Sequence, residues 1–314
     1  MSKTLSVRLF FVLLLSGIII FLPGCAKSEN SGEEPLGDLR LPPVYSPARV
    51  LTPEAPGTQT LGSSPLVLDI SNQDQGYLTA QSDSEDSRMS IQLTTPSGVL
   101  YSYFLAPKEQ AVIPFSEGSG DYVITCYQQI NGSQYAALYS ETLTVNLENE
   151  FLPFLYPNQY VNFSAESEAC TLAQSLVTEE MKDVDILKTF YNYVTSHITY
   201  DYDKANSVEA GYLPDIDETL RTGTGICFDY AALLTAMLRS QDIPCKLEIG
   251  YSGEIKHAWI DVYIRGKGWA TKAVSFDGDT WQLMDPTFDA NSDDDETIQE
   301  YIGDESNYTV QFSR

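Results

Sequence analysis

Short runs of alternating or β-rich apolar residues fill the chain from about residue 63 to residue 150. Apolar residues at a period of two favour half-buried strands. Turn-forming residues separate the runs, and Asn131-Gly132 between two of them is typical of a β-hairpin. The predicted strands are 66–70, 77–81, 89–93, 99–105, 111–115, 122–128, 135–139 and 143–147. Their spacing predicts an antiparallel β-sandwich over residues 63–150, of the immunoglobulin-like (Ig-like) kind.

The pattern changes near residue 151, where apolar positions begin to recur at helical spacing. Two helices are predicted over 165–181 and 184–197, and an irregular stretch rich in glycine follows. A further helix is predicted directly after Cys227, with Pro244 beyond its end. The β-like runs that come next are 246–251, 257–264 and 281–284. A helical half followed by a β half predicts an α+β domain over residues 151–314.

The N-terminal segment has the pattern of an export signal. Lys3 and Arg8 precede an apolar run over residues 9–22, which is short for a membrane span. Cys25 directly follows Gly24, and this arrangement resembles a bacterial lipoprotein signal, in which residues 1–24 are removed and Cys25 is lipidated. An uncleaved signal anchor is the alternative. Residues 25–62 are rich in Ser, Glu, Gly and Pro, which predicts a flexible tether on the outer side of the cell membrane.

The charge balance narrows the classes of partner. The formal net charge is −26 and the pI is near 4.2. Such a chain repels polyanions, so nucleic acid and anionic lipid headgroups are not expected as direct partners. The membrane contact that we expect is the lipid on Cys25.

Three residues have contexts that suit acyl transfer by a thiol. Cys227 stands at the start of a predicted helix, His257 begins a β-like run, and Asp285 ends another. This chemistry needs a thiolate, a base that forms it, and a carboxylate that orients the base. The free N–H groups and the dipole at a helix N-terminus favour a thiolate over a thiol, and the same N–H groups can hold an oxyanion.

The alternatives for each role are few. The chain has only two histidines, and the other is His197, near the end of a predicted helix. Asp261 competes with Asp285, but it lies four residues along the strand from His257, which is about 13 Å in an extended chain. Asp229, two residues after Cys227, is expected to accept hydrogen bonds from the helix-start N–H groups.

Three sequence blocks resemble the transglutaminase-like superfamily, which has a papain-like fold. They are Gly-Ile-Cys-Phe-Asp-Tyr-Ala at residues 225–231, His-Ala-Trp at 257–259 and Asp-Pro-Thr at 285–287, in the order that the family has. The resemblance implies a transglutaminase-core domain and cysteine-dependent chemistry on peptide or side-chain amides: proteolysis, deamidation or crosslinking. Because the family can use an aromatic side chain upstream of the cysteine as an oxyanion donor, Tyr200 and Tyr202 are the residues considered for that role.

Other features point to no cofactor. The remaining cysteines, Cys126, Cys170 and Cys245, are odd in number, so one pair at most could form, and the sequence does not say which. The acidic loop 289–300 partly matches a calcium loop, but Asp294 replaces its glycine, so a solvated acidic loop is favoured. Zinc ligands, a phosphate loop and a dinucleotide fingerprint are missing from the sequence.

The sequence therefore predicts a cell-surface lipoprotein enzyme that acts through Cys227, His257 and Asp285. Its substrate would be a protein, a peptide or a cell-wall peptide, and its intermediate an acyl-thioester on Cys227. Hydrolysis is preferred over crosslinking, because water is always available as the acceptor. The alternative is a binding or scaffold protein that keeps the fold without a working site.

Overall fold

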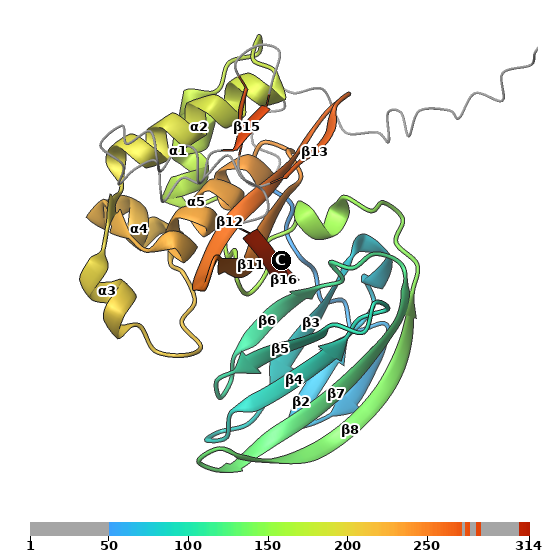
Figure 1. Ribbon diagram of the computed structural model, residues 1–314. Coiled ribbons are helices and arrows are strands. Elements are labelled where there is room, and N and C mark those ends of the chain that lie inside the picture. Colours follow the sequence, from blue (N-terminus) through green and yellow to red (C-terminus); the bar gives the residue numbers. More distant parts are fainter. Residues whose placement is uncertain (1–49, 272–273, 277–280, 284–307) are drawn as a thin grey trace, which may run out of the picture. The chain divides into compact units, whose positions relative to one another are not determined.

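The computed structural model describes residues 50–271, 274–276, 281–283 and 308–314 (Figure 1). Cys25, Asp285 and the acidic loop 289–300 lie outside these residues, so the predictions made for them are untested by the structure. In the part that is described, none of the helices combines the length and the apolar character that crossing a membrane requires.

Residues 60–145 form two four-stranded antiparallel sheets around one apolar core. The sheet orders are β1-β2-β3-β6 and β5-β4-β7-β8. The strands are β1 (Thr60–Ser63), β2 (Leu66–Asp69), β3 (Tyr77–Ser82), β4 (Met89–Thr94), β5 (Leu100–Leu105), β6 (Gln110–Pro114), β7 (Gly120–Asn131) and β8 (Gln134–Val145). Both sheets contribute buried residues to this core, among them Leu68 and Ile91. The two-layered sandwich is as predicted, whereas its Ig-like character stays a prediction.

The longest hairpin of the sandwich forms where the sequence places it. β7 ends at Asn131, and Asn131 pairs with Gln134 at the start of β8. Gly132 has a φ of 53°, a conformation that glycine adopts at low cost. β8 is a single strand that covers two separately predicted runs, because a register shift at Cys126/Tyr127 absorbs the break in alternation.

Residues 50–63 lie on the folded part of the chain, although the predicted tether extends to residue 62. Val50 packs against the core of the second domain, and the Glu54 amide donates to the Tyr77 hydroxyl at 2.9 Å. β1 pairs with β2 along its whole length. These contacts are mostly backbone hydrogen bonds, which a composition poor in apolar residues does not reveal.

Beyond residue 150, helices surround α5 and a four-stranded antiparallel sheet packs beside it (Figure 1). The helices are α1 (Glu168–Leu176), α2 (Asp183–His197), α3 (Tyr202–Ser207), α4 (Ile216–Thr222) and α5 (Cys227–Arg239). The strands are β9 (Thr199–Tyr200), β10 (Thr224–Gly225), β11 (Cys245–Ser252), β12 (Ile255–Ile264), β13 (Gly268–Ala270), β14 (Val274–Phe276), β15 (Trp281–Leu283) and β16 (Tyr308–Ser313). The order of the large sheet is β13-β12-β11-β16.

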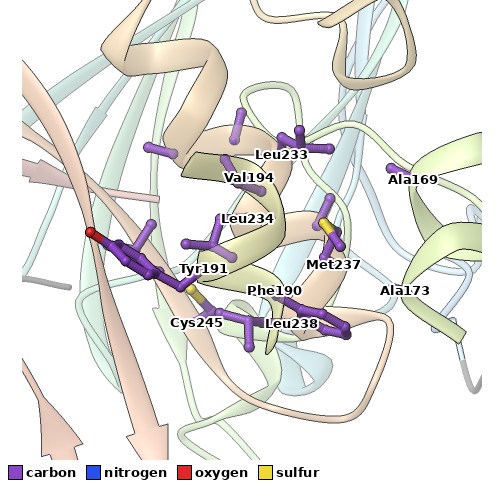
Figure 2. Packing of buried hydrophobic residues seen from close by; sticks show 14 of the residues in the cluster. Ala169, Ala173, Phe190, Tyr191, Val194, Leu233, Leu234, Met237, Leu238 and Cys245 are labelled. Atoms are coloured by element: carbon purple, nitrogen blue, oxygen red, sulfur yellow. The ribbon is translucent and has the colours of Figure 1, made fainter. Parts of the chain in front are cut away.

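The core of this domain forms around α5. Figure 2 shows Leu233, Leu234 and Met237 of α5 among side chains from α1 and α2, such as Ala173 and Phe190. On the other side, β11 and β12 contribute buried residues to the same cluster. All residues of α5 from Asp229 to Arg239 are buried. An α-helix that is apolar on every face is typical of a position inside a domain.

The stretch predicted as irregular contains two short helices, α3 and α4. Each begins with an aspartate cap: Asp201 accepts from the Lys204 amide at 2.8 Å, and Asp215 accepts from the Glu218 amide at 2.9 Å. Gly223 ends α4 with a φ of 64°. These helices have six and seven residues, too few for the apolar spacing of a helix to show in the sequence.

β16 is a strand that the sequence analysis did not predict. It pairs with β11 through a register that shifts between Ile249 and Gly250. Arg314, which follows β16, is buried: its guanidinium donates to the Tyr103 hydroxyl at 3.0 Å and lies 4.2 Å from the centre of the Tyr101 ring. The backbone oxygen of Arg314 accepts from Arg239 at 2.7 Å. The strand is therefore fixed to side chains of β5 and of α5.

Gly250 is the residue that lets β16 approach β11. A Cβ atom on Gly250 would lie 2.0 Å from the Thr309 carbonyl oxygen and 2.9 Å from Cη2 of Trp259. Neither atom is the end of a flexible side chain. Glycine is needed here for space, since its φ is not among the positive values of the chain.

Replacing Gly250 with alanine should destabilise the fold through this overlap. We expect a loss of about 2 kcal/mol or more in the free energy of unfolding, measured by urea denaturation. Gly266→Ala is the matched control, because open space surrounds Gly266 and only its φ of +75° disfavours a side chain, at a cost of about 1 kcal/mol. Equal losses in the two variants would contradict the assignment.

Candidate active site

Cys227 is the first residue of α5. Ile226 before it is extended, with φ −100° and ψ 174°, and the Asp229 carboxylate accepts from the Ile226 amide at 2.8 Å. Cys227 is partly buried and packs against the core of the domain. Its thiol thus lies in the first turn of a helix, where unpaired N–H groups and the helix dipole favour a negative charge.

Asp229 holds the first turn of α5 through a buried network. Besides the Ile226 amide, its carboxylate accepts from the Lys204 ammonium at 2.7 Å and from the Tyr212 hydroxyl at 2.5 Å. Burial lowers the pKa of Lys204, but its interactions with Asp229 and Tyr212 together outweigh burial, so the pKa is raised. Burial and the bond to Asp229 raise the pKa of Tyr212 to about 12. The expected helix-start role of Asp229 is confirmed.

Lys204 and Tyr212 were missed by the sequence reasoning. They lie 25 and 17 residues before Asp229, in the stretch that was predicted as irregular. A buried carboxylate needs a cation or several donors, so an aspartate inside an otherwise apolar helix start was the signal that such partners exist. The sequence does not identify which lysine or tyrosine supplies them.

The structure places Tyr200 closer to the start of α5 than Tyr202. Tyr200 in β9 pairs in register with Gly225 in β10, and Gly225 lies two residues before Cys227. The backbone is fixed there, since the Asp201 amide donates to the Gly225 carbonyl at 2.9 Å. Tyr202 is 64% exposed, and its ring meets that of Tyr200 edge-on at 4.9 Å. This placement favours Tyr200 over Tyr202 as the aromatic residue beside the thiol.

His257 lies on β12, opposite Gly250 of β11, and is buried. By strand alternation, Ala258 and Ile260 face α5, whereas His257 and Trp259 lie on the other face of the strand. The imidazole contacts the Trp259 ring at 6.2 Å and the Tyr308 ring at 6.3 Å. α5 and β12 pack together through the face of β12 that carries Ala258 and Ile260.

The alternative base is His197, and the alternative carboxylate is Asp261. His197 ends α2, where its ring stacks on Tyr193 at 4.0 Å and its Nδ1 lies 2.8 Å from the Tyr193 carbonyl oxygen. These contacts stay within α2, as expected for a solvated helix end. Asp261 is buried on β12 itself, four residues from His257. Asp285 falls outside the described residues, so its role stays a prediction.

Four described cysteines are free thiols, and Cys227 differs from the other three. Burial raises the pKa of Cys126 to about 11 and that of Cys170 and Cys245 to about 12. Cys126 and Cys245 lie in strands and are fully buried, as predicted for small apolar core residues. At neutral pH these three thiols stay protonated and shielded, so Cys227 is the accessible nucleophile of this set.

A cavity of about 350 Å³ is lined by residues of the sandwich and of the second domain. Its walls include Arg88 and Phe104 from the sandwich and Tyr160 and Tyr212 from the second domain. Both tyrosine rings pack against Phe228, at 6.2 and 6.3 Å. Phe228 directly follows Cys227, so two residues of the cavity wall contact the helix turn that carries the thiol. Across the described ranges, His, Cys, Asp and Glu side chains form no group of three that could hold a metal ion.

The large sheet also buries a carboxyl group on the face that carries His257. Glu248 of β11 pairs with Trp259 and is 2% exposed. Its two oxygens accept from the Ser313 hydroxyl at 2.9 and 2.7 Å. Burial and the nearby Asp261 carboxylate raise the pKa of Glu248, so that its neutral form is favoured in the folded protein.

The family model described as "Transglutaminase-like superfamily" matches residues 170–286. The chain therefore contains a transglutaminase-like domain, with a papain-like fold that mixes helices and sheet. The matched range includes α5 and β12, and with them Cys227 and His257. The resemblance seen in the three sequence blocks is confirmed.

Two curated proteins are similar to parts of this chain. The Kyphoscoliosis peptidase of Homo sapiens is 27% identical over 137 residues, which are 40% of this chain and 19% of that protein. The UPF0252 protein MJ1282 of Methanocaldococcus jannaschii is 33% identical over 69 residues, 20% of each chain. The matches thus span about a fifth of these curated relatives.

A comparison with solved structures finds similarity to the periplasmic domain of TgpA from Pseudomonas aeruginosa. It is 14% identical, with a TM-score of 0.35, over 77% of this chain and 98% of that one. Red sea bream transglutaminase is 10% identical, with a TM-score of 0.29, over 72% of this chain and 53% of that one.

The buried Glu248 should make stability fall as the pH rises. The unfolded chain ionises this group near its ordinary pKa of 4.5, whereas the folded chain keeps the proton to higher pH. The folded state therefore loses stability progressively above about pH 4.5, by about 1.4 kcal/mol for each pH unit that separates the two pKa values. Glu248→Gln, which mimics the neutral form, should flatten this dependence in urea denaturation between pH 5 and 9. The exposed Glu141→Gln should leave it unchanged, and identical slopes in all three proteins would refute the assignment.

Proposed function

We propose that this protein is a cell-surface lipoprotein enzyme that transfers acyl groups through Cys227, most directly a cysteine peptidase or amidase. The observation that carries the proposal is the position of Cys227 in the first turn of α5, a helix buried from Asp229 onward, within a transglutaminase-like domain. Such a helix presents its N-terminal N–H groups and dipole to the thiol. His257 on the packed strand β12 supplies the base, and Asp285 orients it.

The reaction runs in two halves. His257 takes the proton of the Cys227 thiol, and the thiolate attacks the carbonyl carbon of an amide. The oxyanion that forms is held by N–H groups of the first turn of α5, with Tyr200 as the aromatic residue beside them. The C–N bond then breaks, and the imidazolium gives its proton to the leaving amine. Water attacks the thioester with His257 as base, which releases a carboxylic acid and restores the thiol.

The substrate class is a protein, a peptide or a cell-wall peptide. The cavity beside Phe228, with aromatic rings and polar groups in its walls, supports a polypeptide segment lying next to Cys227. Water is the preferred acceptor, and crosslinking to an amine is the second outcome of the same thioester. A non-catalytic binding or scaffold protein is the alternative, and it requires a thiol of ordinary reactivity at Cys227.

The proposal extends to the whole chain. Residues 1–24 serve as the signal peptide, Cys25 carries the lipid that anchors the protein to the outer side of the bacterial membrane, and residues from 26 onward lead to the sandwich at 63–150. The catalytic domain covers 151–314. The net charge of −26 supports a partner other than nucleic acid.

The alkylation rate of Cys227 against pH, followed by mass spectrometry with iodoacetamide, tests the catalytic proposal. We expect fast labelling near pH 6, because a paired imidazole stabilises the thiolate far below the ordinary thiol pKa of about 8.5. His257→Ala should slow labelling at pH 6 by about tenfold or more. The three buried cysteines provide an internal control, since their raised pKa values and burial should leave them unlabelled.

His197→Ala is the matched control for this experiment, because His197 is exposed and its contacts stay within α2. Cys227 in this variant should be alkylated at the wild-type rate. If the alkylation rate of Cys227 follows an ordinary thiol pKa and does not change in His257→Ala, the enzyme proposal is wrong. The scaffold alternative then remains.

The lipid anchor has its own test. In a bacterial host, the wild-type chain should partition into the membrane fraction and its N-terminal peptide should start at a lipid-modified Cys25. Cys25→Ser should abolish the modification and release the protein from the membrane or leave residues 1–24 attached. If the wild type and Cys25→Ser partition equally into the membrane and both retain residues 1–24, the uncleaved signal anchor is favoured.

A further inference from the structure

Three aromatic rings meet on the face of the sheet that carries His257 and Trp259. The His257 ring is nearly parallel to that of Trp259, at 6.2 Å and 24°. Tyr308 of β16 lies 6.3 Å from His257 and meets Trp259 edge-on at 5.3 Å and 70°. All three residues are buried, with Tyr308 7% exposed and Trp259 fully covered. The histidine is thus bounded by one ring from its own strand and one from β16.

The contact between Tyr308 and the β12 rings crosses an intervening strand. Tyr308 pairs with Ser252 of β11, and β11 separates β16 from β12. The β11 residue opposite His257 is Gly250, whose missing side chain leaves the surface of β11 open at this point. The Trp259 ring occupies this gap, since its Cη2 lies 2.9 Å from where a Cβ would be. Gly250 thereby allows the Trp259 ring of β12 and the Tyr308 ring of β16 to touch across β11.

β16 is held firmly enough to position a ring. The Ser313 amide donates to the Tyr101 hydroxyl at 3.1 Å, and the Ser116 hydroxyl donates to the Ser313 carbonyl at 2.8 Å. The Phe312 ring meets the Tyr101 ring edge-on at 5.2 Å. These anchors lie at the opposite end of the strand from Tyr308 and do not involve the His257 ring. A substitution at Phe312 therefore removes an aromatic contact of β16 without removing a contact to the histidine, while the hydrogen bonds of Ser313 still hold the strand.

The charged and titratable groups on this face belong to β11, β12 and β16. Among the described residues they are Lys246 and Glu248 on β11, Asp261 and Tyr263 on β12, and Tyr308 on β16. Glu248 accepts a hydrogen bond from the Ser313 hydroxyl. Burial and the nearby Asp261 carboxylate raise the pKa of Glu248, which favours its neutral form. Tyr308 and Trp259 are the described aromatic neighbours of the imidazole.

We propose that Tyr308 is a positioning residue for His257. Its ring closes one side of the space in which the imidazole sits, while Trp259 closes another, so that the ring keeps one orientation when it takes the Cys227 proton. The inference rests on the proposed function for the role of His257, and it goes beyond that function by assigning a task to β16. Small displacements of a reacting group lower rates steeply, by about 100-fold for 1 Å.

Four variants separate positioning from stability. Tyr308→Phe keeps the ring, Tyr308→Leu keeps apolar volume without a ring, and Tyr308→Ala removes both. Phe312→Ala is the matched control, since it deletes an aromatic ring of the same strand that packs on Tyr101 rather than on His257. For each variant, the alkylation rate of Cys227 is measured from pH 5 to 9, together with unfolding by urea.

The imidazole is also observed directly by NMR. The chain has two histidines, and His197→Ala assigns the signals. This readout reports on the His257 ring whether or not the ring is paired with Cys227.

We expect Tyr308→Phe to label Cys227 within about threefold of wild type and Tyr308→Leu and Tyr308→Ala to label it about tenfold or more slowly at pH 6. The His257 signals should shift or broaden in the last two variants, and Phe312→Ala should match wild type in both readouts. Wild-type labelling and imidazole signals in Tyr308→Leu would overturn the inference, as would an equal loss in Phe312→Ala. An ordinary thiol profile in the wild type would defeat the proposed function instead, and the imidazole signals would still decide whether Tyr308 fixes the ring.

Discussion

The burial of α5 from Asp229 to its end is the constraint on which the rest of the second domain depends. Three helices and two strands surround this helix, and every residue from Asp229 to Arg239 is buried. An enclosed helix can offer its polar backbone groups only at its ends. At the C-terminal end, Arg239 donates to the carbonyl oxygens of Tyr156, Cys245 and Arg314. The N-terminal end carries Cys227.

The first turn of α5 is shaped by a carboxylate that does not react. The Asp229 carboxylate accepts hydrogen bonds from the Ile226 amide, the Lys204 ammonium and the Tyr212 hydroxyl. It thereby connects these three residues. Removing one partner of such a buried group leaves a polar atom without solvation, at a cost of about 3–5 kcal/mol for an ion pair. This hydrogen-bond network therefore fixes the helix turn that carries the thiol. The two tyrosines that pack on Phe228, Tyr160 and Tyr212, also form part of the cavity wall.

Much of this arrangement could be predicted from local sequence. The apolar positions of α5, the strands β11 and β12 and the hairpin of β7 and β8 follow from periodicity and turn residues, and Cys227 and His257 stand out because their flanks match a family. The parts that could not be predicted depend on contacts distant in sequence. Among the described strands β16 pairs with β11, more than 50 residues earlier, and α3 and α4 are too short to show a period. Lys204 and Tyr308 acquire their roles only through the fold.

The most direct test of a working thiol site is acylation by an activated acetyl ester. Intact-mass and peptide analysis at pH 6 would follow acetylation of Cys227 and its turnover by water in the wild type, Cys227→Ser and His257→Ala. If His257 generates the thiolate, the wild type should form a thioester on Cys227 and release acetate over many cycles. Cys227→Ser should form none, and His257→Ala should acylate far more slowly. Slow acylation of Cys227 at the same rate in the wild type and in His257→Ala would contradict the catalytic assignment.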